Sequence, residues 1–114
     1  MDYDRDLPPV VSTLRRGPEV IRLVEAFARA LPGLCAALQA SAVCEDLAAA
    51  AAAAHRLKGS AGGYGFALVH DLAAAVERAA NDRDGTLCCD LARRLVEVGS
   101  RVRAGAVDQG WDQP

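Results

Sequence analysis

The stretch AAAAAAAHRLKGSAGGYG, from Ala48 to Gly65, decides how the chain folds. Alanine has the highest helix propensity, and the alanine run contains no residue that breaks a helix. Gly62 and Gly63 are expected to end the helix, because glycine readily adopts the left-handed conformation that closes one. The stretch therefore predicts a strong helix with His55 near its C-terminal end and Lys58 one turn further on.

A helical wheel separates this histidine from the side of the helix that faces the core. At about 100° per residue, one stripe of the helix is apolar. Its members are Leu47, Ala50, Ala54, Leu57 and Ala61. His55 projects away from the stripe and shares a flank with Ala51, Gly59 and Gly62, with Lys58 at the border. Because its neighbours there are alanine and glycine, another protein can lie flat against this flank and reach the imidazole.

The motif A-H-x-L-K-G-S-A, from Ala54 to Ala61, resembles the histidine-containing phosphotransfer (HPt) domain of bacterial and plant-type phosphorelays. Gly65 falls where this family usually has a glycine. Glu77 falls where the family carries Glu or Gln. The resemblance extends over roughly Pro18 to Val102, which is most of the chain.

The resemblance implies that His55 is phosphorylated. The phosphoryl group would come from an aspartyl phosphate on a receiver domain and pass to the aspartate of another receiver. Lys58 is placed to offset the phosphoryl charge. Glu77 is expected to accept a hydrogen bond from the ring nitrogen that does not attack. Ser60 also matches the motif, but the wheel places it on the opposite flank and indicates a structural role.

The same resemblance implies what the chain binds. Partner docking is expected on a surface made by Ala51, Arg56, Gly59 and Gly62. The expected partners are response-regulator receiver domains and a hybrid histidine kinase. We expect a monomeric phosphohistidine carrier without kinase activity and with no bound cofactor, the divalent metal being held only by the receiver.

Composition limits the other functions that the chain can have. The 114 residues suit one domain, and 52% of them are hydrophobic but only 4% aromatic, which favours closely packed helices. The net charge of -2 argues against a nucleic-acid binder. No apolar run is long enough to span a membrane, and the N-terminal MDYDRDLPP lacks the apolar core of a signal peptide. The default expectation is a cytoplasmic protein.

Histidine and cysteine spacing does not indicate a metal site. His55, His70 and the cysteines do not lie at ligand spacings that a helix can bring together. The cysteines contain no C-x-x-C pair and are expected to be reduced, partly buried residues. They are Cys35, Cys44, Cys88 and Cys89. His70 is expected to be an ordinary solvated histidine on the third long helix.

Apolar periodicity predicts an all-α fold, an up-down-up-down four-helix bundle with a short N-terminal helix. The HPt-like bundle is expected over residues 10–105, between a disordered lead-in at 1–9 and a flexible tail at 106–114. Trp111 in this tail either docks on the body of the bundle or is exposed. The short helix is expected at Val10 to Arg15. The third and last long helices are expected at about Phe66 to Ala80 and Thr86 to Ala104, separated by a turn, NDRDG.

Two details of the first two long helices are also predicted. The first opens at Gly17–Pro18, with proline in its first turn. Pro32 should kink or briefly break it near Ala28 to Leu31, because proline removes one backbone hydrogen bond. Ser41 is expected to cap the second helix.

Two other functional classes share features with a phosphotransfer domain. A sensor histidine kinase also phosphorylates a histidine on a helical bundle, but its motif has an acidic residue directly after the histidine, where this chain has Arg56. The chain also lacks an ATP-binding motif. The remaining alternative is a helical interaction module that binds receivers or kinases without phosphotransfer.

Overall fold

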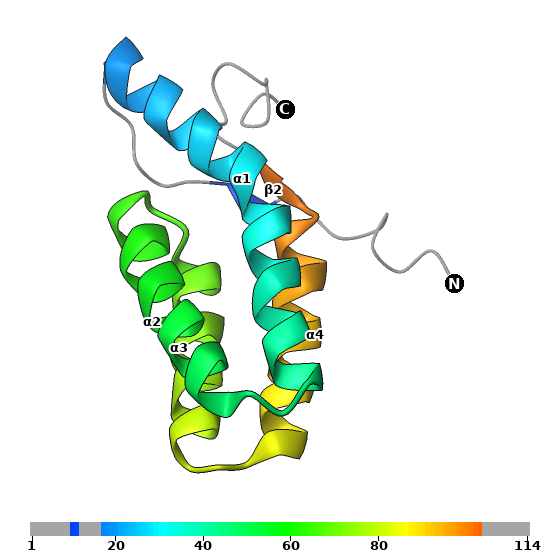
Figure 1. Ribbon diagram of the computed structural model, residues 1–114. Helices are drawn as coiled ribbons and strands as arrows, with labels where there is room; N and C mark the ends of the chain where they lie inside the picture. The colour runs from blue at the N-terminus through cyan, green and yellow to red at the C-terminus, as the bar shows by residue number, and fades with distance from the viewer. Residues whose placement is uncertain (1–9, 12–16, 104–114) are drawn as a thin grey trace.

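The computed structural model describes residues 10–11 and 17–103, in which the chain forms four long helices and two very short strands. The elements in chain order are β1 (Val10–Val11), α1 (Pro18–Val43), α2 (Leu47–Gly63), α3 (Ala67–Asn81), α4 (Gly85–Gly99) and β2 (Val102–Arg103). Each helix runs in the direction opposite to the one before it, with α2 and α3 on one side and α1 and α4 on the other (Figure 1). The predicted all-α class is confirmed.

Three connectors of one design reverse the chain between the helices. The middle residue of each has a positive φ, at 62° for Glu45, 83° for Gly65 and 62° for Arg83. Its N–H donates to the carbonyl three residues back, and the next N–H donates to the carbonyl five residues back. These bonds satisfy carbonyls at the end of the finished helix. Glycine suits this conformation at Gly65, which explains the glycine there in physical terms.

The core between the helices consists mainly of small aliphatic side chains, with the aromatic residues at one end. Phe66 is 1% exposed and lies against Phe27, with 5.8 Å between the ring centroids. Tyr64 stacks on the same Phe27 ring at 5.0 Å. Other large, fully buried side chains are Leu31, Leu38, Leu95, Val24, Val69 and Val76. The aromatic cluster therefore fixes the α2–α3 connector to α1.

Helix α1 continues past the two points where the sequence suggested an interruption. Pro32 lies inside the helix, which is unbroken from Pro18 to Val43. In Figure 1 its axis changes direction near the middle. The prediction that Ser41 caps the second helix is wrong, because Ser41 is still in α1 and the cap of α2 is Asp46.

The ends of the bundle differ from the prediction. Val10 and Val11 are extended and pair in parallel with Val102 and Arg103, so the short helix expected at Val10 to Arg15 does not include its first two residues. The N–H of Val10 donates to the carbonyl of Arg101 at 2.9 Å. The last helix ends at Gly99 rather than near Ala104. At this end of the bundle, the backbone groups of β1 and β2 bond to each other, and this pairing takes the place of further helix in both segments.

Several sequence predictions lie outside the described residues. They are the lead-in at 1–9, the rest of the short helix at 12–15, and the tail at 106–114 with Trp111.

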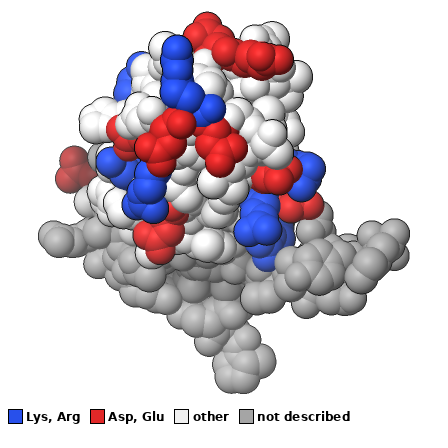
Figure 2. Space-filling model, turned by 90° about the horizontal axis from the view of Figure 1, so that it is seen from below, with Lys and Arg blue, Asp and Glu red and all other residues white. Residues whose placement is uncertain are grey.

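The bundle end that carries the α1–α2 and α3–α4 connectors has mixed charge. Acidic and basic side chains are interleaved on the face seen in Figure 2. This face therefore has no broad field of one sign, in keeping with the small net charge of the chain.

We expect Gly99→Ala to lower the stability of the bundle by about 1–2 kcal/mol, because it overpacks the α1–α4 contact. A Cβ at Gly99 would lie 3.1 Å from Sγ of Cys35, which is fully buried. Chemical denaturation of Gly99→Ala, Cys35→Ala and the double variant measures the effect. The double variant should be more stable than the sum of the single losses predicts, and simple additivity would contradict this explanation.

Candidate functional site

Helix α2 begins at an aspartate cap and continues through the alanine run. The side chain of Asp46 accepts a hydrogen bond from the Ala49 N–H at 3.2 Å, satisfying one of the free N–H groups at the helix start. The helix ends at Gly63, and the N–H of Tyr64 donates to the Ser60 carbonyl. The C-terminal half of α2 thus carries the whole histidine motif on regular helix.

The wheel prediction for this helix is confirmed by burial. The core stripe includes four residues that are at most 5% exposed: Ala50, Ala54, Leu57 and Ala61. The side chain of His55 is 67% exposed. Burial of the small stripe holds α2 close to the bundle, while the imidazole remains accessible on the outer flank.

Glu77 of α3 contacts two side chains of the α2 motif, His55 and Lys58. Its Oε2 lies 3.0 Å from Nδ1 of His55, and its Oε1 lies 2.8 Å from Nζ of Lys58. The Glu77 side chain is 20% exposed and that of Lys58 is 31% exposed. Helices α2 and α3 are antiparallel, so the one-turn spacing of His55 and Lys58 places both beside the same carboxylate.

Lys58 is the main electrostatic influence on this carboxylate. Its hydrogen bond lowers the pKa of Glu77 below the ordinary value of 4.5; partial burial opposes this, and the hydrogen bond from His55 lowers the pKa further. Glu77 is therefore ionised near neutral pH and can only accept hydrogen bonds. A group with a lowered folded-state pKa stabilises the fold at neutral pH, and this contribution is lost as the pH falls through the lowered value.

The ionised carboxylate determines which imidazole nitrogen can react. Because Glu77 can only accept, Nδ1 of His55 must carry the proton that it donates. In the neutral ring the lone pair is then on Nε2, which makes no hydrogen bond to any residue that the structure describes. The site thus presents a nucleophilic nitrogen to solvent on a ring held in one tautomer.

The residues expected to form a docking surface divide between two flanks of α2. Gly59 is exposed, and a Cβ there would meet nothing within 4 Å. Ala51 is half-buried. Arg56 is exposed and lies on the flank toward α1, where it lines a groove of about 300 Å³ with Leu34, Ala37, Ala53, Leu57 and Ser60.

The structure changes the environment expected for three residues. The ammonium of Lys58, which was expected to face the imidazole of His55, is paired with Glu77. Gly62 is exposed, but a Cβ there would lie 3.2 Å from Cδ2 of His70, so an imidazole covers one side of it. His70 itself is 42% exposed, with Nδ1 3.0 Å from Oδ1 of Asp71. No pattern in the sequence indicates the contact between His70 and Gly62, because it depends on the pairing of α2 with α3.

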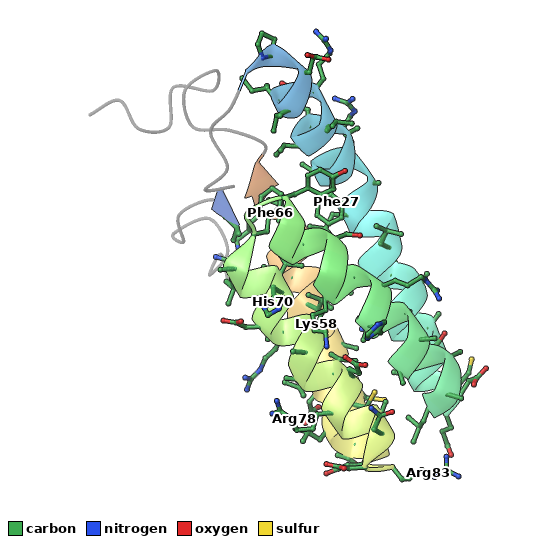
Figure 3. All side chains as sticks on the ribbon, turned by 90° about the vertical axis from the view of Figure 1, so that its left-hand side faces the viewer. Phe27, Lys58, Phe66, His70, Arg78 and Arg83 are labelled. Carbon is green, nitrogen blue, oxygen red and sulfur yellow. The ribbon has the colours of Figure 1, made fainter. Side chains whose placement is uncertain are left out.

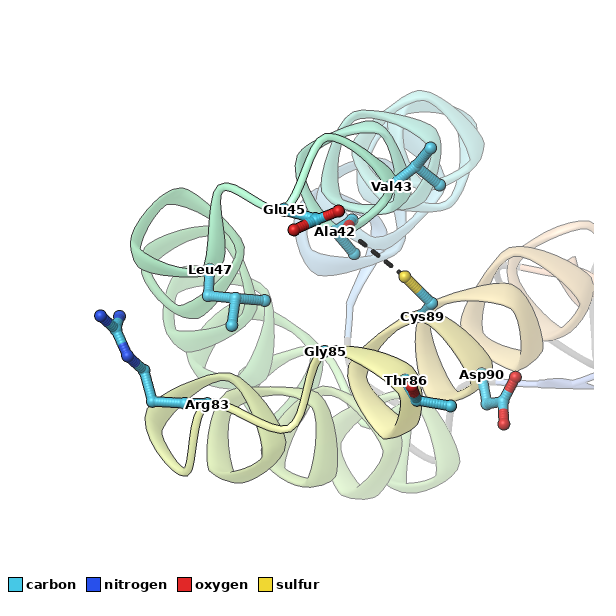
Figure 4. A pocket seen from close by; sticks show the side chains of 9 residues that line it. All are labelled: Ala42, Val43, Glu45, Leu47, Arg83, Gly85, Thr86, Cys89 and Asp90. Atoms are coloured by element: carbon cyan, nitrogen blue, oxygen red, sulfur yellow. Dashed lines mark hydrogen bonds between the residues drawn. The ribbon is translucent and has the colours of Figure 1, made fainter.

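A pocket lies at the bundle end shown in Figure 4. It has a volume of about 600 Å³, and none of its lining residues belongs to the His55–Lys58–Glu77 cluster. The thiol of Cys89 donates to the Ala42 carbonyl at 3.3 Å, while Arg83 and Asp90 extend away from the hollow (Figure 4). The pocket therefore offers no set of convergent polar groups.

All four cysteines are free thiols, and three of them are fully or partly buried, but the expectation of burial is wrong for Cys44, which is exposed. Burial raises the pKa of Cys35 to about 11. It also raises the pKa of Cys88, with smaller effects from Cys89 and Asp84. These two buried thiols are protonated at neutral pH and poorly nucleophilic. Within residues 10–11 and 17–103, no group of three His, Cys, Asp or Glu side chains is placed to hold a metal ion.

The comparison with protein families agrees with this geometry. The family model of the Hpt domain matches residues 22–105, and the chain belongs to this family. Hpt domains are histidine-containing phosphotransfer domains of two-component signalling, phosphocarriers rather than catalysts. No curated protein and no solved structure matches the chain significantly. Among the described residues, none of the helices is both long and apolar enough to cross a membrane.

We expect Gly59→Gln to raise the stability of the domain while slowing phosphotransfer. Glycine inside a helix costs about 1 kcal/mol relative to a good helix former, and the space around Gly59 is open. A side chain there would obstruct a partner approaching His55. Thermal unfolding and transfer from a phosphorylated receiver measure the two effects.

The matched control for this variant is Gly33→Ala on α1, where a Cβ would also meet nothing within 4 Å. It should gain stability without slowing transfer. A Gly59→Gln protein that is more stable and transfers at the wild-type rate would show that no partner passes close to Gly59.

Proposed function

We propose that the chain is a phosphorelay intermediate that accepts a phosphoryl group on His55 from a receiver aspartate and passes it to another receiver aspartate. The observation that carries the proposal is the hydrogen bond between His55 Nδ1 and Glu77, combined with a His55 side chain that is 67% exposed. When the ring is neutral, this arrangement leaves the reactive lone pair on Nε2.

In the transfer step, Nε2 attacks the phosphorus atom of the aspartyl phosphate. A nitrogen–phosphorus bond forms while the bond from phosphorus to the carboxylate oxygen breaks, and the aspartate leaves as a carboxylate. The Nδ1 proton stays hydrogen-bonded to Glu77, which stabilises positive charge that develops on the ring. The reverse reaction at a second receiver returns the imidazole to its starting state.

The proposed partners are receiver domains and a hybrid histidine kinase, with the divalent metal of the reaction held by the receiver. The chain would work as a monomer in the cytoplasm, and the exposed flank around His55 and Gly59 would carry the contact. Nothing in this scheme requires the chain to bind nucleotide or metal.

Incubation with a phosphorylated receiver tests the proposal. Label on the chain should be labile in acid and stable in base, as expected for phosphohistidine. The assay should be repeated with each receiver domain of the source organism. A chain that binds a receiver but takes no label from any of them would be an interaction module without phosphotransfer.

Lys58→Met tests whether the lysine stabilises phosphorylated His55 or only orients the Glu77 carboxylate. Because the Lys58 hydrogen bond is the largest influence on Glu77, we expect the pKa of that carboxyl to rise in the variant. Loss of a charge-assisted contact that is partly exposed costs about 1 kcal/mol, so phosphorylated His55 should be roughly fivefold less populated at equilibrium with a phosphorylated receiver. The effect should shrink at high salt.

Carboxyl titration by NMR and the phosphate distribution at two ionic strengths measure these changes. Lys58→Arg, which keeps the charge, is the matched control and should be affected less. If Lys58→Met shifts the pKa of Glu77 but leaves the phosphate distribution at the wild-type value, the lysine orients the carboxylate without affecting phosphorylation.

A further inference from the structure

His70, on the first turn of α3, is held in a defined orientation. Its Nδ1 lies 3.0 Å from Oδ1 of Asp71, and the side chain is 42% exposed. Since the carboxylate accepts the Nδ1 proton, the lone pair of the neutral ring is on Nε2. That nitrogen makes no hydrogen bond to any residue in the described part of the chain.

The imidazole of His70 lies over the backbone of Gly62. A Cβ at Gly62 would be 3.2 Å from Cδ2 of the ring, closer than an ordinary contact. Glycine at this position therefore allows the ring to lie against α2. His70 and Glu77 are both on the side of α3 that faces α2, so His70 lies along the same helix–helix seam as the His55–Glu77 pair (Figure 3).

His70 lies close enough to His55 to be covered by a partner that docks on His55. Gly62 follows His55 by about two turns of helix, a distance of about 10 Å along the axis. A standard interface covers about 800 Å² on each partner, which corresponds to a disc of about 15 Å radius. A smaller, transient interface centred on His55 still extends past Gly62.

Few side chains on this part of the seam can recognise a partner by hydrogen bonding. Gly59, Gly62 and Gly63 have no side chain, and Ala74 lies between Glu77 and His70 on α3. Lys58 is already paired with Glu77. On this stretch, toward the C-terminal end of α2, Nε2 of His70 is a side-chain atom that makes no hydrogen bond to a described residue.

We propose that His70 is a recognition residue for the receiver domain, with Nε2 accepting a hydrogen bond from an N–H or O–H group of the docked receiver. The inference rests on the proposed function, because it requires a receiver centred on His55. His70 does not touch the reacting atoms in this scheme. It sets the affinity and the choice of receiver, while Asp71 orients the ring and Gly62 leaves room for it.

The test is the initial rate of phosphotransfer as a function of receiver concentration. For His70→Ala, the concentration that gives half the maximal rate should rise roughly fivefold, as expected for one hydrogen bond, with the saturating rate unchanged. His70→Gln places an amide at similar reach and should recover most of the affinity. Leu68→Ala, on the opposite flank of α3 and 45% exposed in the wild type, is the matched control and should change neither quantity.

Titration with the unphosphorylated receiver measures docking independently of chemistry. The affinity should fall for His70→Ala in both the wild-type and the His55→Gln backgrounds. An unchanged half-saturating concentration, or a loss equal to that of Leu68→Ala, would overturn the assignment of His70. Absence of label on the wild-type chain would instead overturn the phosphotransfer function, so the two failures are distinguishable.

Discussion

His55→Gln is expected to abolish phosphoryl acceptance while leaving the helical content and the unfolding transition close to those of the wild type. The amide of glutamine is not a nucleophile toward an acyl phosphate, so no nitrogen–phosphorus bond can form. The His55 side chain is 67% exposed and lies off the core stripe, so its replacement removes little packing. Label transfer from a phosphorylated receiver and circular dichroism measure the two properties.

The matched control for this variant is His70→Gln. It removes the other histidine of the chain and should still accept label at a saturating receiver concentration. Acid-labile label on the His55→Gln protein, at a level comparable to the wild type, would show that another residue is the acceptor.

Glu77→Ala is expected to have the second largest effect, a loss of about tenfold in the transfer rate at saturating receiver. Hydrogen bonds to charged groups contribute about 1.5–3 kcal/mol. Because the His55–Glu77 pair is partly exposed to solvent, we expect its hydrogen bond to contribute at the lower end of this range. Without the carboxylate, the imidazole of His55 is free to place its proton on Nε2, where it blocks the reactive lone pair. Single-turnover kinetics and the nitrogen NMR signals of the His55 ring measure the rate and the tautomer.

Glu77→Gln is the matched variant for this prediction, because it keeps a carbonyl oxygen that can accept the Nδ1 proton but removes the charge. It should lose less activity than Glu77→Ala. If both variants transfer at the wild-type rate, Glu77 does not control the tautomer and its partnership with Lys58 is purely structural.

The candidate site was largely readable from the sequence because its residues lie on regular helices. His55 and Lys58 are one turn apart on α2, and helix geometry alone places them on neighbouring positions. The exposure of His55 and the burial of Ala50, Ala54, Leu57 and Ala61 follow from the wheel. The pairing of Lys58 with Glu77 could not be predicted from the sequence, because it depends on the position of α3 relative to α2.

The errors in the fold concern contacts between distant parts of the chain. Val10 resembles the start of a helix locally, yet its N–H bonds to the carbonyl of Arg101. Ser41 has the character of a cap, but α1 extends to Val43 and the cap of α2 is Asp46. Local propensity is a weak guide when backbone groups have an alternative partner or when packing lengthens a helix.

The sequence by itself determined the four helices, the exposed histidine and the positions of the turns, because these depend on periodicity, propensity and spacing within one segment. Tertiary structure decided how α2 and α3 align, and that alignment brings Glu77 to Nδ1 of His55 at 3.0 Å and seats His70 over Gly62. The physical reason is that helix alignment follows from core packing and from three-residue connectors with left-handed middle residues. Two of those residues, Glu45 and Arg83, are not glycine, so only the folded chain shows their conformation.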